Sequence, residues 1–535
     1  MEGVRFFDCN SMIGRRAYRE PETIYSKEQF LEDFKYYNIV GSLVYEALAV
    51  EYNPAVGNER LMTETEGSER LFPSWVLMPH QTGEMKEPKE LIASMVERKV
   101  LAARLFPKRH RFSLSGDSCK PLLDELEKNG IPVFIDAAEA TIGEVLEVCK
   151  RHPDLKVVRT RQWHGEERLL FPALERCDNL YIDTVYFQGF NVIAFVCKEF
   201  GADRMLYSAD LPYADPGAAK MHILYADINL KEKRMIAGEN LQRLLGGVEL
   251  KPYPDWKPAD NLIATVEEGR PLSDVLVIDA HGHISGEDEM TFPGKFAPNS
   301  DAEGLIKAMD ALGVDMMVIS AGASLYSDSK LGNKIVAEAM RRYPNRFIGA
   351  GCINPNYPED IDEEIQFCFY KSGMKVVKPY PAAHKYPLFG SRYRRLLECA
   401  DRLRLPVLTP GYCDHLPEHR EPVKMVEKLS REYPKAKFLM VHSGSRYPVA
   451  RRYVELAKRC GNVFLEITYT TITYGMIKYL VDEVGDDRVL FGSDAAFRDI
   501  APQLGWVVYA KISEESKRKI LGLNMKRILD DVKAP

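Results

Sequence analysis

The sequence predicts an α/β protein built from two tandem (β/α)8 barrels of the TIM type. Its 535 residues suit two barrels of roughly 250 residues each. Each half alternates short apolar segments, typical of buried strands, with amphipathic helical segments, and this alternation favours parallel strands joined by helices. An open, doubly wound sheet is the alternative, but no Gly-x-Gly-x-x-Gly motif follows the first strand of either half.

The two halves resemble each other, which is the third observation behind the two-barrel prediction. Residues 201–210 (GADRMLYSAD) match residues 485–494 (GDDRVLFGSD) at an offset of 284, and residues 239–245 match residues 523–529 at the same offset. A further similarity joins residues 129–134 to residues 403–408. Agreement over the C-terminal part of each half indicates a tandem duplication.

Eight strands are expected in the first half, which we place at residues 1–248. They end near Asn10, Ala47, Met78, Phe106, Asp136, Arg161, Tyr186 and Asp210. A linker is expected at residues 249–273, because its four prolines interrupt both the strand and the helix periodicity. These prolines are Pro252, Pro254, Pro258 and Pro271.

The second half, residues 274–535, shows the same alternation. Its strands are expected to end near His283, Ala321, Cys352, Tyr380, Pro410, His442, Tyr469 and Asp494. Amphipathic helices are expected between them. In residues 300–313, for example, Ser300 or Asp301 is the expected N-cap, apolar residues recur on one helical face, and Gly313 ends the helix.

Composition excludes several classes of function. The net charge of −6 and the pI near 6.1 give no electrostatic reason to expect nucleic acid or an anionic membrane as a partner. Ten cysteines occur without a Cys-x-x-Cys pair, which suggests reduced thiols. The first residues show no signal-peptide pattern, and no apolar run approaches the roughly 20 residues of a membrane span. We therefore expect a cytoplasmic protein that acts on a small molecule.

The first strand of the second half ends in a His-x-His motif. The apolar run 275–278 leads into Asp279, Ala280, His281, Gly282 and His283. Side chains two residues apart lie on the same face of a strand, so both imidazoles can converge on one point. Neutral imidazole is a common ligand for zinc and similar ions, and the motif therefore suits a buried divalent-metal site.

Two other strand ends of this half carry residues that can join the two histidines. The sixth strand ends in His442 and the eighth in Asp494. Chemistry in such barrels lies at the carboxyl ends of the strands, where these side chains can approach a single axis. Two histidines and a carboxylate leave a coordination position open for water, as a catalytic metal requires.

These motifs resemble those of the amidohydrolase superfamily, in particular the amidohydrolase-related group that includes aminocarboxymuconate-semialdehyde decarboxylase. The resemblance covers roughly residues 275–530 and rests on the segments 279–283, 406–408, 441–444, 487–494 and 524–529. It implies a metal-dependent hydrolase fold with one divalent ion, zinc first and manganese as the alternative. It also implies that His281, His283 and Asp494 bind the metal, and that His442 binds the metal or polarises the reacting group.

One departure from the family concerns the fifth strand. The family usually carries a metal-binding histidine after this strand, whereas this chain has Pro410 there. Cys413, His415 or His419, on the loop beyond, could replace it, or His442 could complete the set. At the end of the fourth strand, Lys378 and Tyr380 are the expected substrate-binding residues; a lysine there could hold a substrate carboxylate, or lie on the rim.

The first half resembles the same family but lacks its metal ligands. Its first strand ends in Asn10 where a histidine is expected, its fifth ends in Asp136, and its sixth has no histidine. Because only Asp210 remains, we expect this barrel to be metal-free. The segment 104–110 places cations near the mouth of the fourth strand, either as an anion site or as a basic rim.

The sequence therefore predicts an enzyme whose active site lies in the second barrel. Hydrolysis of an amide, ester or lactone is the first expectation, with Asp494 taking a proton from water and His442 stabilising negative charge. Non-oxidative decarboxylation of an unsaturated carboxylic acid is the second, and a non-catalytic tandem barrel that binds a ligand is the third. Relatives of the family commonly pair their barrels, so we expect the two barrels to pair within the chain, with a homo-oligomer as a further expectation.

Overall fold

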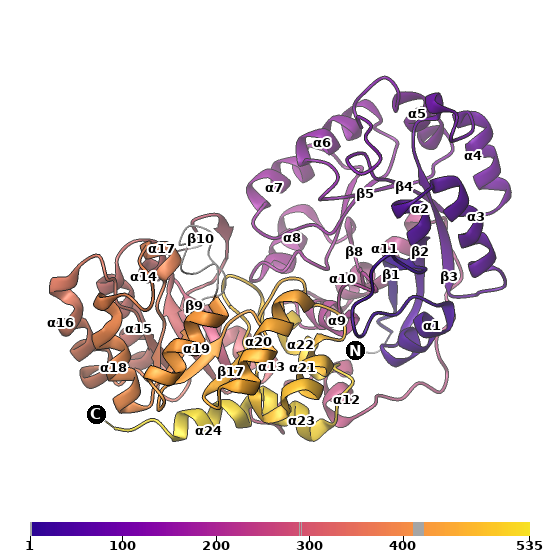
Figure 1. Ribbon diagram of the computed structural model, residues 1–535. Helices are drawn as coiled ribbons and strands as arrows, with labels where there is room; N and C mark the ends of the chain where they lie inside the picture. The colour runs from indigo at the N-terminus through magenta and orange to yellow at the C-terminus, as the bar shows by residue number, and fades with distance from the viewer. Residues whose placement is uncertain (1–2, 288, 290, 410–421, 535) are drawn as a thin grey trace. The chain divides into compact units, whose positions relative to one another are not determined.

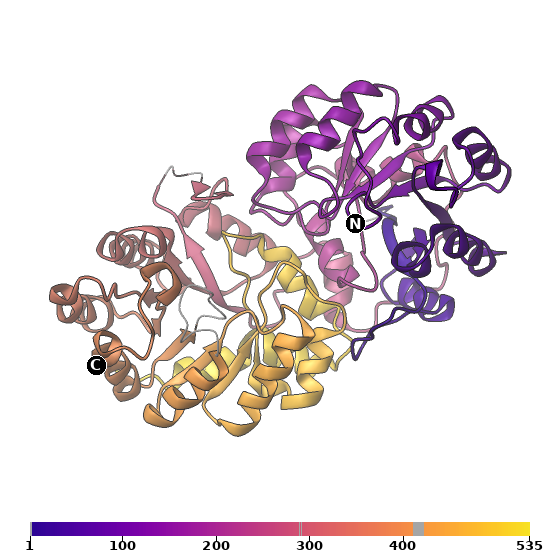
Figure 2. The ribbon, with the colours of Figure 1, turned by 45° about the horizontal axis from the view of Figure 1, so that its top comes forward.

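The chain forms two units, each built around an eight-stranded parallel sheet. The computed structural model describes residues 3–287, 289, 291–409 and 422–534. Unit 1 comprises residues 1–188 and 192–259, and unit 2 comprises residues 189–191 and 260–535. In each unit the helices lie around the outside of the strands (Figures 1 and 2). The two tandem (β/α)8 barrels predicted from the sequence are confirmed.

The strands of unit 1 are paired in chain order, from β1 to β8. They are β1 (Phe6–Ile13), β2 (Ile39–Glu46), β3 (Leu71–Leu77), β4 (Ala102–Leu105), β5 (Val133–Asp136), β6 (Val157–Thr160), β7 (Leu180–Asp183) and β8 (Met205–Leu206). The helices are α1 (Lys27–Tyr36), α2 (Ala47–Glu51), α3 (Pro54–Thr65), α4 (Pro88–Glu97), α5 (Lys120–Lys128), α6 (Ile142–Arg151), α7 (Glu167–Arg176), α8 (Val192–Phe200), α9 (Pro216–Leu224), α10 (Leu230–Arg234) and α11 (Asn240–Leu244).

Unit 2 repeats this order, with a two-stranded hairpin, β10 (Thr291–Phe292) and β11 (Lys295–Phe296), inserted after its first strand. The barrel strands are β9 (Ile278–Ile284), β12 (Met316–Ala321), β13 (Phe347–Gly351), β14 (Val376–Val377), β15 (Pro406–Thr409), β16 (Lys437–Met440), β17 (Val463–Glu466) and β18 (Val489–Leu490). The helices are α12 (Asn261–Glu267), α13 (Ala302–Leu312), α14 (Gly322–Tyr326), α15 (Ser329–Arg342), α16 (Ile361–Ile365), α17 (Pro381–His384), α18 (Arg394–Leu403), α19 (Pro422–Glu432), α20 (Tyr447–Arg459), α21 (Met476–Val484), α22 (Ile500–Val508), α23 (Glu514–Arg518) and α24 (Asn524–Asp530).

Backbone hydrogen bonds join the first strand of each unit to the segment that follows the eighth. In unit 1 the amide of Cys9 donates to the Tyr207 carbonyl at 3.0 Å. In unit 2 the amide of Ala280 donates to the Phe491 carbonyl at 3.0 Å, and the amide of Asp494 donates to the His281 carbonyl at 2.7 Å. These bonds close each sheet into a barrel, so the carboxyl ends of the first and eighth strands lie side by side.

The barrel of unit 2 is filled by apolar side chains that alternate along the strands. The buried core includes Ile278, Ala280, Val318, Ala350, Val376, Leu408, Leu439, Phe464 and Leu490, together with Met525 and Ile528 of α24. This packing fills the interior, and the polar residues of the site lie at the carboxyl ends of the strands. The first unit has a corresponding core.

The repeated sequence near the end of each half has a structural reason. In unit 1 the side-chain amide of Asn240 donates to the carbonyls of Ala202 and Met205, at 2.7 and 2.9 Å. In unit 2 the side-chain amide of Asn524 donates to the carbonyls of Asp486 and Val489, at the same distances. Each asparagine thus ties the last helix to the turn before the eighth strand. The duplication is visible at the level of single hydrogen bonds.

Two details of the predicted elements are resolved by the structure. Helix α13 has Asp301 rather than Ser300 as its N-cap, since the Asp301 carboxylate accepts a hydrogen bond from the Gly304 amide at 2.9 Å, and Gly313 ends the helix with φ of 81°. The predicted linker 249–273 contains helix α12, which belongs to unit 2 because the Tyr509 hydroxyl donates to Glu267 at 2.6 Å. Among the described residues, no helix is long and apolar enough to span a membrane.

Candidate metal centre

The two histidines of the His-x-His motif point into the barrel because β9 contains a bulge. Between the pairs Asp279–Met317 and Gly282–Ile319 the strand β9 has one residue more than β12. Without this extra residue the alternation that buries Ile278 and Ala280 would continue to Gly282, and the histidines would face outward. A bulge re-aims the side chains that follow it. It therefore places His281 and His283 on the inner face.

A buried carboxylate holds this bulge in place. Asp279 accepts hydrogen bonds from the backbone amides of His281 and Ser493, both at 3.0 Å, and from the Ser493 hydroxyl. Burial raises the pKa of Asp279 to about 7. Because Asp279 bridges β9 and the segment after β18, it fixes the first and last strand ends relative to each other.

Asp494 reaches both histidines from the end of the eighth strand. Its Oδ1 lies 2.9 Å from Nε2 of His283 and 3.4 Å from Nε2 of His281. The residue has a left-handed backbone, with φ of 62°. Its other oxygen is paired with Arg498, whose Nε donates to the Thr470 hydroxyl at 2.7 Å. One carboxylate oxygen is thus directed at the histidines and the other is held by an arginine.

The protonation states of these three residues suit a divalent ion. Burial lowers the pKa of His281 and of His283 to about 3, so both imidazoles are neutral. Burial alone would raise the pKa of Asp494, but Arg498 and the two histidines outweigh it and hold that pKa well below its usual range. One ligand atom from each residue lies within 4.8 Å of the others. Two neutral imidazoles and one carboxylate form a donor set that fits a divalent metal.

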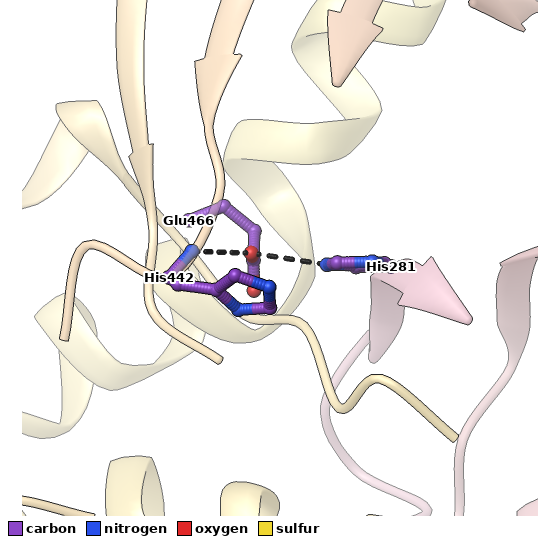
Figure 3. A group of neighbouring side chains, drawn as sticks. All are labelled: His281, His442 and Glu466. Carbon is purple, nitrogen blue, oxygen red and sulfur yellow. Dashed lines mark hydrogen bonds and ion pairs between the residues drawn. The ribbon is translucent and has the colours of Figure 1, made fainter. Parts of the chain in front are cut away.

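Glu466 is a functional candidate that the sequence analysis missed. It is the last residue of β17, it is fully buried, and its Oε2 lies 3.2 Å from Nδ1 of His281 and 3.3 Å from the backbone nitrogen of His442. Figure 3 shows the Glu466 carboxylate between the His281 ring and the His442 backbone. The hydrogen bond assigns the proton of His281 to Nδ1 and leaves Nε2 unprotonated, as a metal ligand must be. The sequence signal that could have indicated Glu466 is an acidic residue at the end of an apolar strand.

His442 lies beside His281 and has a fixed tautomer. Its ring centroid is 5.5 Å from that of His281, and its backbone is left-handed, with φ of 62°. Nδ1 lies 2.9 Å from the Thr468 carbonyl oxygen, which can only accept, so Nδ1 carries the proton and Nε2 is unprotonated. His281, His442 and Glu466 form a second group whose ligand atoms lie within 4.8 Å of one another. The structure thus brings all four predicted metal residues together.

The predicted substrate-binding residues Lys378 and Tyr380 lie near the histidines, Lys378 in direct contact with His281 and Tyr380 through Ser320. Nζ of Lys378 lies 2.7 Å from Nε2 of His281, and burial lowers the pKa of this lysine to about 8. The Tyr380 hydroxyl is 2.8 Å from that of Ser320, which is 3.3 Å from Nδ1 of His283. Lys378 therefore lies inside the site and is not a rim residue. It contacts the same nitrogen that a metal would use.

An aromatic stack covers one side of His283. The ring of Phe497 lies parallel to the imidazole at 4.0 Å between centroids, and Phe292 of the β10–β11 hairpin packs edge-on against Phe497 at 4.6 Å. Both phenylalanines are buried. The stack restricts the imidazole to one orientation, and it ends the site with an apolar surface.

Strand β15 ends at Thr409. Outside the described residues lie Pro410 and the candidate replacements Cys413, His415 and His419.

The expectation that Arg104 contributes to a cationic rim is wrong. Its side chain is 2% exposed and donates inside unit 1, for instance to the Ser74 hydroxyl at 2.8 Å, because position 104 of β4 faces the interior of the barrel.

Comparison with known proteins identifies relatives of both halves. A sequence profile of the family described as Amidohydrolase matches residues 46–247 and 278–530, one segment in each half. The gamma-resorcylate decarboxylase of a Rhizobium species is 22% identical over 285 residues, which cover 42% of this chain and 85% of that protein.

Solved structures of similar proteins include two decarboxylases. A 2,6-dihydroxybenzoate decarboxylase from Rhizobium is 18% identical with a TM-score of 0.38, and the match covers 48% of this chain and 99% of that one. A 5-carboxyvanillate decarboxylase from Novosphingobium aromaticivorans, solved with manganese, is 16% identical with a TM-score of 0.38, and the match covers 48% of this chain and 97% of that one.

Proposed function

The chain belongs to the amidohydrolase family, and we propose that its second barrel is a divalent-metal-dependent decarboxylase of a hydroxy-substituted aromatic acid. The observation that carries this proposal is the group formed by His281, His283 and Asp494 with a buried ammonium, Lys378, 2.7 Å from one of the imidazoles. A metal donor set beside a cation suits a substrate with two oxyanions, such as a hydroxybenzoate.

His281, His283 and Asp494 would hold the metal, and His442 is close enough to join them. When bound, a divalent ion would act as a Lewis acid toward the substrate oxygens. Lys378 would bind the substrate carboxylate or an adjacent phenolate, because its ammonium is buried beside the metal donor set. Glu466 would keep His281 in the tautomer that leaves Nε2 unprotonated.

The reaction needs a proton at the ring carbon. The bond between that carbon and the carboxylate breaks, its electron pair stays on the carbon, CO2 leaves, and a proton from the protein takes its place. Asp494 and His442 are the groups that could carry this proton. Since Nε2 of His442 is unprotonated, His442 would first accept a proton, for instance from a substrate hydroxyl, and would not begin by stabilising negative charge.

Decarboxylation is preferred here to the hydrolysis that the sequence analysis put first. The sequence relative with the name gamma-resorcylate decarboxylase supports this choice. The site adds an argument, since His281, His283, Lys378 and Asp494 are all buried and one of them is a cation suited to a carboxylate. Hydrolysis of a lactone, amide or ester remains an outcome that the same assay can detect.

The test is a substrate panel on metal-loaded protein. We expect CO2 release from 2,6-dihydroxybenzoate or a related hydroxybenzoate with zinc or manganese, and none from the His281→Ala/His283→Ala double variant. His80→Ala, which removes a histidine of unit 1 that pairs with Glu87, is the matched control and should retain activity. Turnover of lactones or amides without CO2 release would replace the proposal by a hydrolase. A chain that binds no metal and turns over neither class would be a binding protein.

A further inference from the structure

The corresponding site of unit 1 contains an arginine where the second barrel has its metal ligands. Arg161 follows β6, and its guanidinium contacts two carboxylates at the strand ends. One nitrogen donates to Asp136, the last residue of β5, at 2.8 Å, and two others lie 2.8–3.0 Å from the oxygens of Asp210, after β8. A single cation therefore bridges the ends of the fifth, sixth and eighth strands.

The backbone around this arginine matches that of unit 2. Strand β1 carries the same one-residue bulge, between the pairs Asp8–Ser42 and Ser11–Val44. Asp8 accepts a hydrogen bond from the backbone amide of Asn10 at 3.0 Å, as Asp279 does from the backbone amide of His281. Arg161 and Asp210 are left-handed, with φ of 52° and 48°, as are His442 and Asp494. Each backbone position at these strand ends of unit 1 therefore has a counterpart in unit 2.

The side chains at these positions do not fit a divalent ion. Asn10 stands where unit 2 has His281, and its amide oxygen is taken by Arg104 at 2.6 Å while its amide nitrogen donates to Asp210 at 2.9 Å. Met12 stands in place of His283. Asp210 also accepts from the Tyr186 hydroxyl at 2.8 Å. Every oxygen of Asp210 is therefore already paired with a donor of the protein.

We propose that the guanidinium of Arg161 is an internal substitute for the metal ion in unit 1. It supplies the positive charge that two adjacent buried carboxylates require, and its planar fork reaches both of them at once. Unit 1 then binds no divalent ion at this position, and the ends of its strands are held together without one. The inference concerns unit 1 alone and stands whether or not unit 2 is a decarboxylase.

Burial and charge explain why the cation is needed. Asp210 is 1% exposed, and burial raises its pKa to about 6 although Arg161 opposes the shift. Burial alone would lower the pKa of Arg161, but Asp210, Tyr45 and Asp136 outweigh it and hold that pKa well above its usual value. An unpaired charge left in such a site destabilises a protein strongly.

Asp183 is a buried carboxylate of unit 1 that has no histidine beside it among the described residues, unlike Glu466 of unit 2. It is the last residue of β7, as Glu466 is of β17, and its Oδ1 accepts a hydrogen bond from the backbone amide of Gln162 at 3.1 Å. Its Oδ2 is buried without a hydrogen-bond partner, whereas both oxygens of Glu466 accept hydrogen bonds, one of them from His281. Asn10 is too short to replace that imidazole. The carboxylate that positions a ligand in unit 2 therefore has no such task in unit 1.

Metal counting tests the proposal directly. We expect the His281→Ala/His283→Ala variant to bind no zinc or manganese after dialysis, because its remaining barrel carries Arg161. About one ion per chain that is lost on a further Asp210→Asn substitution would overturn the proposal. The measurement counts ions and not turnover, so failure of the proposed decarboxylase activity would not affect it.

Removal of the cation gives an independent test. Arg161→Met should lower the melting temperature by roughly 5–15 °C, as expected for a buried ion pair broken on one side. Arg161→Lys should restore part of this loss. In the His281→Ala/His283→Ala background, which lacks the unit 2 site, millimolar Mn²⁺ should raise the melting temperature of Arg161→Met but not that of the chain that keeps Arg161. Arg151→Met, which removes a surface ion pair with Glu147, is the matched control. A variant at position 161 that melts like this control would refute the proposal. If Arg161→Met does not fold, the metal count still decides.

Discussion

The hydrogen bonds of Glu466 allow a sharp prediction for the Glu466→Gln variant. The two carboxylate oxygens accept four hydrogen bonds. One oxygen accepts from Nδ1 of His281 at 3.2 Å and from the backbone amide of His442 at 3.3 Å. The other accepts from the backbone amide of Thr468 at 2.8 Å and from its hydroxyl. Glutamine has one acceptor oxygen and one NH2 group, so one pair of donors must face another donor.

The expected magnitude follows from this count. Loss of a carboxylate that orients a metal-binding histidine typically weakens metal binding by about 10- to 100-fold, which corresponds to about 1.4–2.7 kcal/mol. A buried donor left without an acceptor costs a further 1–3 kcal/mol or so of folding stability. We therefore expect Glu466→Gln to fold with a lower melting temperature and to bind zinc or manganese at least 10 times more weakly than the parent chain.

The assay is a metal titration by calorimetry at a temperature where the variant is folded. Asp183→Asn is the matched control, because Asp183 ends the seventh strand of unit 1 as Glu466 does in unit 2 but has no imidazole to orient. It should leave the metal Kd unchanged. A Glu466→Gln variant whose Kd lies within threefold of the parent value would refute the idea that Glu466 orients His281.

Three further predictions concern stability and substrate binding. Burial raises the pKa of Asp183 to about 7, so ionisation of this carboxyl lowers the stability of the folded state as the pH rises from about 4 to 7. In urea denaturation, Asp183→Asn should therefore be more stable than the parent chain at pH 8, by up to roughly 4 kcal/mol. At pH 4 the two chains should be equally stable. Lys378→Met should raise the KM for carboxylate substrates about 10-fold or more without weakening metal binding, as steady-state kinetics and titration would show. A Cβ at Gly444 would lie 2.4 Å from the Trp506 ring, so Gly444→Ala should lower stability by about 1–3 kcal/mol in urea denaturation, and an unchanged midpoint would contradict this.

The fold was predictable from the sequence because its signals are local. Apolar runs of strand length and amphipathic helices alternate in order, and α13 shows capping residues at both ends. Parallel strands paired in chain order then leave few architectures open. The duplication was detectable because the segments that repeat, such as those with Asn240 and Asn524, make the same backbone contacts.

The candidate site was predictable only in part. The histidines and Asp494 stand at strand ends, which a count of elements can locate. The bulge in β9 depends on pairing register with β12, and no local pattern reports it, although it decides which way His281 points. Glu466 and Arg498 matter through contacts with residues brought together by the closed sheet, so their roles follow from geometry and not from spacing.

The two barrels together separate what the fold requires from what the chemistry requires. Both keep the bulge, the aspartate that holds it, and left-handed residues after the sixth and eighth strands. These features form the strand ends and are present with either set of side chains. The ligands differ, since His281 and His442 in one barrel correspond to Asn10 and Arg161 in the other. A positive charge beside the carboxylate of the eighth strand is common to both, supplied by Arg161 in unit 1 and by Arg498 in unit 2. The carboxylate after the eighth strand is thus paired with a cation in both barrels. In unit 2, Arg498 pairs with Oδ2 of Asp494, which leaves Oδ1 directed at two neutral imidazoles.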